Sequence, residues 1–155
     1  MKPVSISEIK KDLEKRNFNE LVDYCLRIAR FKKENKELLA FLLFQSDNIP
    51  DYIENIKQET ESGFLEINKS NIYFIKKSVR KILRRINKHI RFCSSKQTEA
   101  ELLIHFCNCL DRHSILVKNS RQLMNLYERQ LKKIDAALSA LHPDLQYDLK
   151  KQLLK

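Results

Sequence analysis

Residues 71–92 read NIYFIKKSVRKILRRINKHIRF, and this stretch decides the kind of fold that the chain forms. Apolar residues recur in it at intervals of three and four, which places them on one face of an α-helix. They are Ile72, Ile75, Val79, Ile82, Leu83, Ile86 and Ile90. Lysine and arginine fill the other side, because successive helical residues are rotated by about 100°. We call the following eight residues the basic face: Lys76, Lys77, Arg80, Lys81, Arg84, Arg85, Lys88 and Arg91. The sequence therefore predicts a long amphipathic helix, capped by Ser70.

Acidic residues are excluded from the neighbourhood of this helix. Between Glu66 and Glu99 there is no Asp or Glu, and the interval holds ten Lys or Arg residues, which equals the net charge of +10 for the whole chain. Lysine and arginine neutralise phosphates and release counterions, so such a face is typical of polyanion binding, for which Arg84 and Arg85 have the most suitable geometry. Two other interpretations stay open. The face is either a solvated surface that aids solubility, or it pairs with acids elsewhere in the chain, such as Glu54, Glu59, Glu61 and Asp135.

Length and composition narrow the class of protein. A chain of 155 residues suits a single domain over residues 1–155 with a core of its own. With one glycine and three prolines, the sequence lacks the turns of an all-β fold and the glycine-rich loops of nucleotide sites. The N-terminus has no apolar stretch for secretion, and the longest apolar run, residues 38–44, is far shorter than the ~20 residues that span a bilayer. We expect a cytoplasmic protein with reduced cysteines and no membrane contact.

Capping and turn signals predict about eight helices in all. The expected ranges are 5–16, 17 or 19 to 29, 37–45, 50–68, 71–92, 95 or 98 to 110, 119 or 120 to 141, and 143–154. Short links favour antiparallel neighbours, in a compact bundle or a short HEAT-like superhelix. The run at 38–44 is apolar on every side, so we expect the helix at 37–45 to be the most buried. Gly63 lies on the inner stripe of its helix, where glycine permits close packing. A polar loop at 111–119 carries Ile115, Leu116 and Val117 as its apolar contact.

Residues 5–45 contain the segments SISEIKKDLEK (5–15), NELV (19–22) and KENKELL (33–39). Together these segments resemble a family of small, all-helical, uncharacterised bacterial proteins. Residues 71–92 and the segment NLYERQLKK (125–133) are similar in style to the same family. The resemblance implies an all-α fold and a bacterial, cytoplasmic protein. It brings no activity, cofactor or site residue.

Glu101, His105, Cys109 and His113 follow one another at intervals of four, so they share one side of a helix that persists to residue 113. Imidazole and thiolate groups at this spacing can supply two ligands of a tetrahedral zinc site. Cys107 lies about 160° around the helix from Cys109, and the pair does not form a CxxC knuckle. A boundary histidine and small core cysteines explain the pattern equally well. We therefore expect no metal and no cofactor, with His105, Cys109 and His113 as the candidate ligands if a metal binds.

Catalytic templates do not occur in the sequence. Neither Glu-x-x-His nor His-Glu-x-x-His is present, and no local signal supports a nucleophilic pair of a histidine with Cys25 or Cys93. Tyr73, Phe74 and Phe92 flank the basic face, where they suit either base stacking or packing against other helices. We expect a non-catalytic binding or scaffolding protein whose basic face contacts nucleic acid or another polyanion. The alternative is a protein–protein adaptor for an acidic partner, and a metal-binding or cysteine-dependent enzyme is a distant third. The sequence does not indicate an oligomeric state.

Overall fold

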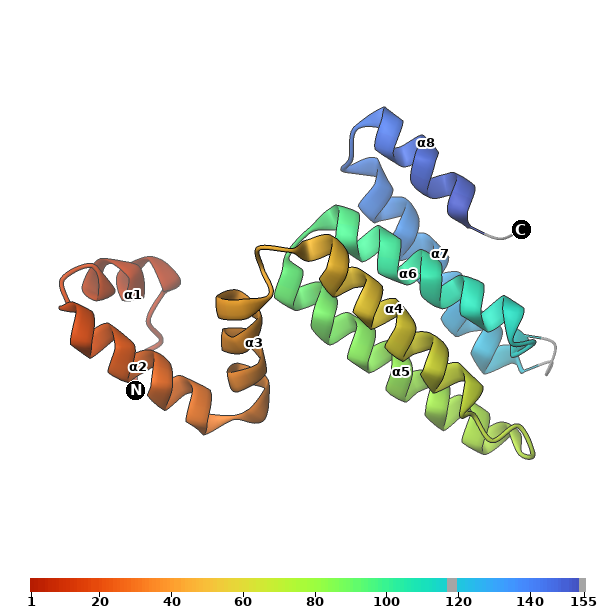
Figure 1. Cartoon of the computed structure of the whole chain (residues 1–155), viewed down its shortest axis with the longest axis horizontal. Coiled ribbons are helices and arrows are strands. Elements are labelled where there is room, and N and C mark those ends of the chain that lie inside the picture. Colours follow the sequence, from red (N-terminus) through yellow and green to blue (C-terminus); the bar gives the residue numbers. More distant parts are fainter. Residues whose placement is uncertain (117–119, 154–155) are drawn as a thin grey trace. The chain divides into compact units, whose positions relative to one another are not determined.

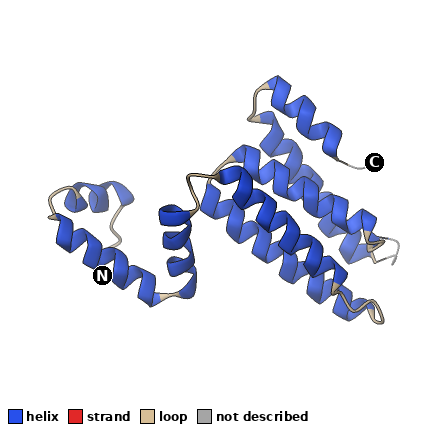
Figure 2. Ribbon diagram, in the orientation of Figure 1, coloured by secondary structure: helices blue, strands red, loops and turns tan. Residues whose placement is uncertain are grey.

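The computed structural model describes residues 1–116 and 120–153, and all regular elements among them are α-helices (Figures 1 and 2). They are α1 (Ile6–Leu13), α2 (Phe18–Phe31), α3 (Lys33–Phe44), α4 (Ile49–Leu65), α5 (Ile72–Cys93), α6 (Lys96–Arg112), α7 (Arg121–Ser139) and α8 (Pro143–Gln152). The prediction of an all-α protein with packed helix pairs is confirmed. In the described part of the chain, no helix has the length and apolar character needed to cross a bilayer.

The chain forms two compact units, Met1–Asp47 with helices α1–α3 and Asn48–Lys155 with helices α4–α8. In the first unit, α2 packs against α3. In the second unit, α6 contacts α4, α5, α7 and α8, and Figure 1 shows it between α4 and α7. The expectation of one domain over residues 1–155 stays a prediction, and each unit is considered by itself below.

Side-chain caps explain where the first two helices begin. The Ser5 hydroxyl oxygen accepts a hydrogen bond from the Glu8 backbone N–H, and the Glu8 carboxylate accepts one from the Ser5 backbone N–H. This is the predicted capping box. Of the two asparagines proposed for α2, Asn17 is the cap, because its side chain forms the same reciprocal pair of hydrogen bonds with Glu20.

The predicted cap of α5 is wrong by one residue. Asn71 is the N-cap, and its side-chain oxygen accepts a hydrogen bond of 2.8 Å from the Tyr73 backbone N–H. Ser70 lies in the preceding turn, where its hydroxyl donates to the Asn68 side chain at 2.6 Å. Because that hydroxyl bonds backwards along the chain, asparagine takes the capping position instead.

The core of the second unit follows the isoleucine stripe of α5. Ile75, Val79, Ile82 and Ile86 are all buried, as the predicted orientation of this helix requires, whereas Ile72 in its first turn is 38% exposed. Gly63 of α4 faces Ile82, and a β-carbon on Gly63 would lie 3.3 Å from two Ile82 side-chain carbons. The glycine therefore permits the close approach of α4 and α5, as predicted.

The expectation that the helix at 37–45 is the most buried is wrong. Across the twelve residues of α3, all of them described, Phe41 alone is buried, and Phe44 is 81% exposed. The physical reason is the small size of the first unit, in which α2 packs against α3, because so few helices cannot cover every side of an apolar helix. Among the described helices α6 is the most buried, since four helices surround it.

The remaining differences concern helix ends. Helix α3 begins at Lys33 rather than Glu37, α4 ends at Leu65 rather than near residue 68, and α7 ends at Ser139 rather than at 141. Helix α6 continues to Arg112, beyond the predicted end at 110. In the loop that follows, Ile115 is buried as expected. Val117 and Leu154 lie outside the described residues.

Candidate functional site

The basic face lies on the side of α5 that the buried isoleucine stripe leaves uncovered. Five of its members are exposed, namely Lys77, Arg80, Lys81, Arg84 and Arg91. Lys76, Arg85 and Lys88 are partly buried. At a rise of 1.5 Å per residue, the eight side chains cover about 22 Å along the helix axis. The helix thus presents a row of basic side chains that is as long as a stretch of nucleic-acid backbone with several phosphates.

Carboxylates of the chain leave most of this charge uncompensated. Seven members of the basic face form no ion pair with an acid within residues 1–116 and 120–153: Lys76, Lys77, Arg80, Lys81, Arg84, Arg85 and Arg91. Of the acids considered as partners, Glu61 instead pairs with Arg112 and His113. Glu54, Glu59 and Asp135 form no ion pair with those seven residues in the described part of the chain. The charge of α5 is therefore directed at solvent or at a partner.

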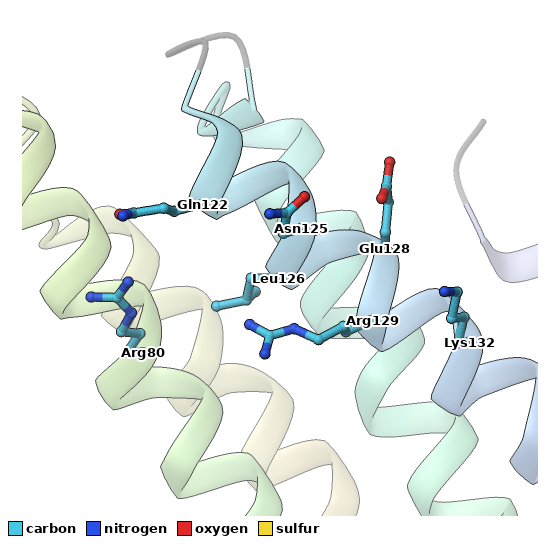
Figure 3. A pocket seen from close by; sticks show the side chains of 7 residues that line it. All are labelled: Arg80, Gln122, Asn125, Leu126, Glu128, Arg129 and Lys132. Carbon is cyan, nitrogen blue, oxygen red and sulfur yellow. The ribbon is translucent and has the colours of Figure 1, made fainter.

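A groove of about 480 Å³ lies between α5 and α7 (Figure 3). Its lining consists of Arg80, Gln122, Asn125, Leu126, Glu128, Arg129 and Lys132. The Arg129 side chain extends towards α5 and Arg80, whereas the Glu128 carboxylate points away from α5 (Figure 3). Two guanidinium groups that approach from facing helices can each donate paired hydrogen bonds to a phosphate. The groove thus extends the positive surface from α5 onto α7.

Sequence reasoning missed Arg129 and Lys132 as members of this surface. They belong to a helix of mixed charge, and nothing in the local pattern predicts that this helix lies beside α5. The available signal was the spacing of Gln122, Asn125, Arg129 and Lys132, which places polar and basic groups on one side of α7. A hydrogen bond of 2.7 Å from Lys76 Nζ to Gln122 Oε1 joins the two helices at one end of the groove.

Exposed aromatic rings lie at the start of α5. Tyr73 and Phe74 are 61% and 45% exposed, and their rings meet edge to face with centroids 5.6 Å apart. Phe92, at the other end of the helix, instead packs edge-on against His89. Of the three aromatic residues considered for base stacking, Tyr73 and Phe74 are therefore accessible to a ligand.

The second set of candidates, on α6, converges on a residue of α4. Cys109 Sγ donates a hydrogen bond to Glu61 Oε2 at 3.2 Å and lies 3.5 Å from His105 Nε2. His113, the C-cap residue of α6, places Nε2 2.6 Å from Glu61 Oε1. Glu101 leaves this group, because its carboxylate accepts a hydrogen bond from Lys57 at 2.6 Å. The three candidate ligands therefore come together around Glu61, which sequence reasoning missed as a site residue because the packing of α4 on α6 is not local.

Burial and hydrogen bonding set the protonation of this cluster. Burial alone would raise the pKa of Glu61, but hydrogen bonds from Cys109 and His113 and the charge of Arg112 outweigh it and lower the pKa. Burial raises the pKa of the Cys109 thiol to about 12, and the Glu61 carboxylate adds to this effect. Burial lowers the pKa of His105. At neutral pH the cluster thus holds a carboxylate, a protonated thiol and a neutral imidazole.

Comparison with known proteins identifies no relative, because no family model, no curated protein and no solved structure matches this chain. The resemblance to small uncharacterised bacterial proteins, and the bacterial origin that it implies, stay predictions.

Proposed function

We propose that the protein binds nucleic acid through the basic face and the groove between α5 and α7, without catalysing a reaction. The observation that carries this proposal is the row of seven basic residues on one helix that have no acidic partner in the described chain. Like charges at the spacing of a helix turn repel one another, and phosphates relieve that repulsion while releasing counterions. A solvated surface that serves only solubility has no need to concentrate one sign of charge in this way.

Single-stranded nucleic acid is the favoured form of the ligand. The exposed Tyr73 and Phe74 rings lie at one end of the cationic row. Proteins that bind single strands combine a positive track for the backbone with aromatic rings on which bases stack, and each stacked base contributes about 1–3 kcal/mol. In a duplex the bases are already stacked on one another, so these rings favour an unpaired strand.

Fluorescence anisotropy with labelled single- and double-stranded oligonucleotides across a salt series tests the proposal. About four phosphate contacts to a single strand would give a log–log salt slope of roughly −3. The variant Lys77→Glu/Lys81→Glu/Arg84→Glu should lose this binding. The control Lys2→Glu/Lys150→Glu/Lys151→Glu makes the same change in net charge at exposed positions outside α5 and α7, and it should bind as the wild type does.

Three results would contradict the proposal. Equal binding by the two variants would show that the nucleic-acid site does not lie on α5. Tighter binding to polyglutamate than to the oligonucleotides would favour an acidic protein partner instead. Absence of binding at low salt would leave the basic face as a solvated surface.

A protein–protein adaptor is a second candidate, and an observation in the first unit favours it. Ile28, Phe31, Leu43 and Phe44 are each at least 60% exposed. A mainly apolar cavity of about 370 Å³ is lined by Leu26, Ala29, Arg30, Lys36, Leu39, Ala40, Leu43 and Phe44. Exposed apolar surface of this kind is typical of protein-binding sites. Under either candidate we propose a cytoplasmic location, which the four unpaired cysteines support.

A further inference from the structure

Three kinds of metal-binding atom meet between α4 and α6. A carboxylate oxygen of Glu61, a ring nitrogen of His105 and Cys109 Sγ lie within 4.8 Å of one another. In a tetrahedral zinc site with bonds of about 2.0–2.3 Å, neighbouring ligand atoms are about 3.3–3.6 Å apart. The contacts of Cys109 Sγ with Glu61 Oε2, at 3.2 Å, and with His105 Nε2, at 3.5 Å, are close to these separations. Two edges of a coordination tetrahedron are therefore formed before any metal binds.

The three ligand residues lie on two helices that pack against each other. His105 and Cys109 are one turn apart on α6, the most buried of the described helices, and Cys109 is fully buried. Glu61 approaches from α4, which packs directly against α6. Ligands on packed helices keep their geometry better than ligands on loops. Two packed helices thus bring together one oxygen, one nitrogen and one sulfur ligand.

His113 orients the Glu61 carboxylate through the oxygen on the side away from Cys109. Its Nε2 contacts Glu61 Oε1, the oxygen that does not face Cys109. The Phe64 ring stacks on the imidazole with centroids 5.6 Å apart and planes inclined by 12°, which fixes the orientation of His113. Hydrogen-bond partners of this type fix the orientation of metal ligands, and their loss weakens metal binding by about 10–100-fold. His113 is therefore a positioning residue rather than one of the three ligands.

The positively charged Arg112 guanidinium contacts two of the three proposed ligands. Arg112 Nη2 donates to Glu61 Oε2 at 3.0 Å and to Cys109 Sγ at 3.4 Å. The Arg112 side chain is 46% exposed, so it can turn towards solvent when a metal cation takes its place. His105 Nε2 donates to the Lys57 backbone carbonyl at 3.1 Å. It becomes a ligand when the imidazole proton moves to Nδ1 and the ring turns, so that the Nε2 lone pair faces the ion instead of the carbonyl oxygen.

We infer that Glu61, His105 and Cys109 bind a divalent transition-metal ion, for which zinc fits the mixed ligand set best, and that the ion joins α4 to α6. Binding replaces the Arg112 guanidinium and releases the proton of the Cys109 thiol to solvent. The change of tautomer at His105 releases no proton. One proton therefore leaves for each ion bound, and the affinity rises about tenfold per pH unit while the free thiol stays protonated. Water completes the fourth position.

Titration of the chelator-treated full-length protein with Co²⁺ and Zn²⁺ tests this inference. Cys25→Ser/Cys93→Ser serves as the background, which removes the two thiols that are not buried. The expected result is one ion per chain, with the visible bands of tetrahedral cobalt and a thiolate-to-cobalt charge-transfer band. Zn²⁺ should displace the cobalt. Absence of saturable binding, or a cobalt spectrum without the charge-transfer band, would overturn the inference.

A matched pair of variants assigns the site. Cys107 and Cys109 are both buried thiols of α6, so Cys107→Ala and Cys109→Ala remove similar core contacts. Cys109→Ala should weaken Co²⁺ binding at least about 100-fold and abolish the charge-transfer band, whereas Cys107→Ala should keep both. Equal binding by the two variants would refute the assignment. If Cys109→Ala does not fold, Glu61→Gln provides the same test, because it keeps the shape of the side chain and removes the charged oxygen ligand.

Discussion

Replacement of Ile82 by aspartate tests the packing of α5, on which the assignment of its buried and exposed sides depends. Ile82 is 6% exposed, and its Cγ1 and Cδ1 atoms lie close against Gly63 of α4. Loss of the buried isoleucine side chain costs about 2–5 kcal/mol, and a carboxyl group with no partner in this contact adds a few kcal/mol more. We therefore expect Ile82→Asp to lower the free energy of unfolding by about 4–8 kcal/mol, which is most of the stability of a typical domain.

Urea denaturation followed by circular dichroism measures this change. The control is Lys81→Asp, which introduces the same residue one position earlier, on the exposed side of α5. Both variants share the low helix propensity of aspartate, so the difference between them isolates burial. Lys81→Asp should change the free energy of unfolding by no more than about 1 kcal/mol. An Ile82→Asp variant as stable as Lys81→Asp would refute the proposed orientation of the helix, and with it the exposure of the basic face.

Three further predictions concern other contacts of the second unit. Asn71→Ala should destabilise the fold by about 1 kcal/mol through loss of the α5 cap, whereas Ser70→Ala should have a smaller effect; denaturation midpoints would show the reverse order if serine were the cap. Gly63→Leu should cost about 1–3 kcal/mol in the same assay, because Ile82 leaves no room for a larger side chain, and an unchanged midpoint would contradict the close approach. The pKa of Glu61 is lowered from 4.5 in the folded chain, so its stabilising contribution is present above that value and disappears as the pH falls through the lowered pKa. Thermal unfolding from neutral to acid pH should therefore show a loss of stability that is smaller in Glu61→Gln.

The sequence predicted the type, number and approximate ends of the helices because those properties depend on neighbours within a few residues. The stripe from Ile75 to Ile86 identifies the buried side of α5, and the Ser5 and Glu8 spacing identifies the start of α1. The apolar run at 38–44 shows where local reasoning fails. Its composition predicts burial, but burial requires enough partner helices, and their number is a property of the unit rather than of the run.

The residues of the two candidate sites also fall into those that the sequence predicted and those that only helix packing added. Both the basic face and the column of His105, Cys109 and His113 follow from the period of one helix, so the sequence by itself determined them. Glu61 and Arg129 became members of the two sites only through the packing of α4 on α6 and the position of α7 beside α5. A helix by itself assigns a side chain to one of its faces, but the partners of that side chain on another helix are distant in the chain. Glu61 is 48 positions from Cys109 and 52 positions from His113. Only the tertiary structure decided those pairings, because the repeat of an α-helix carries no information about which other helix it meets.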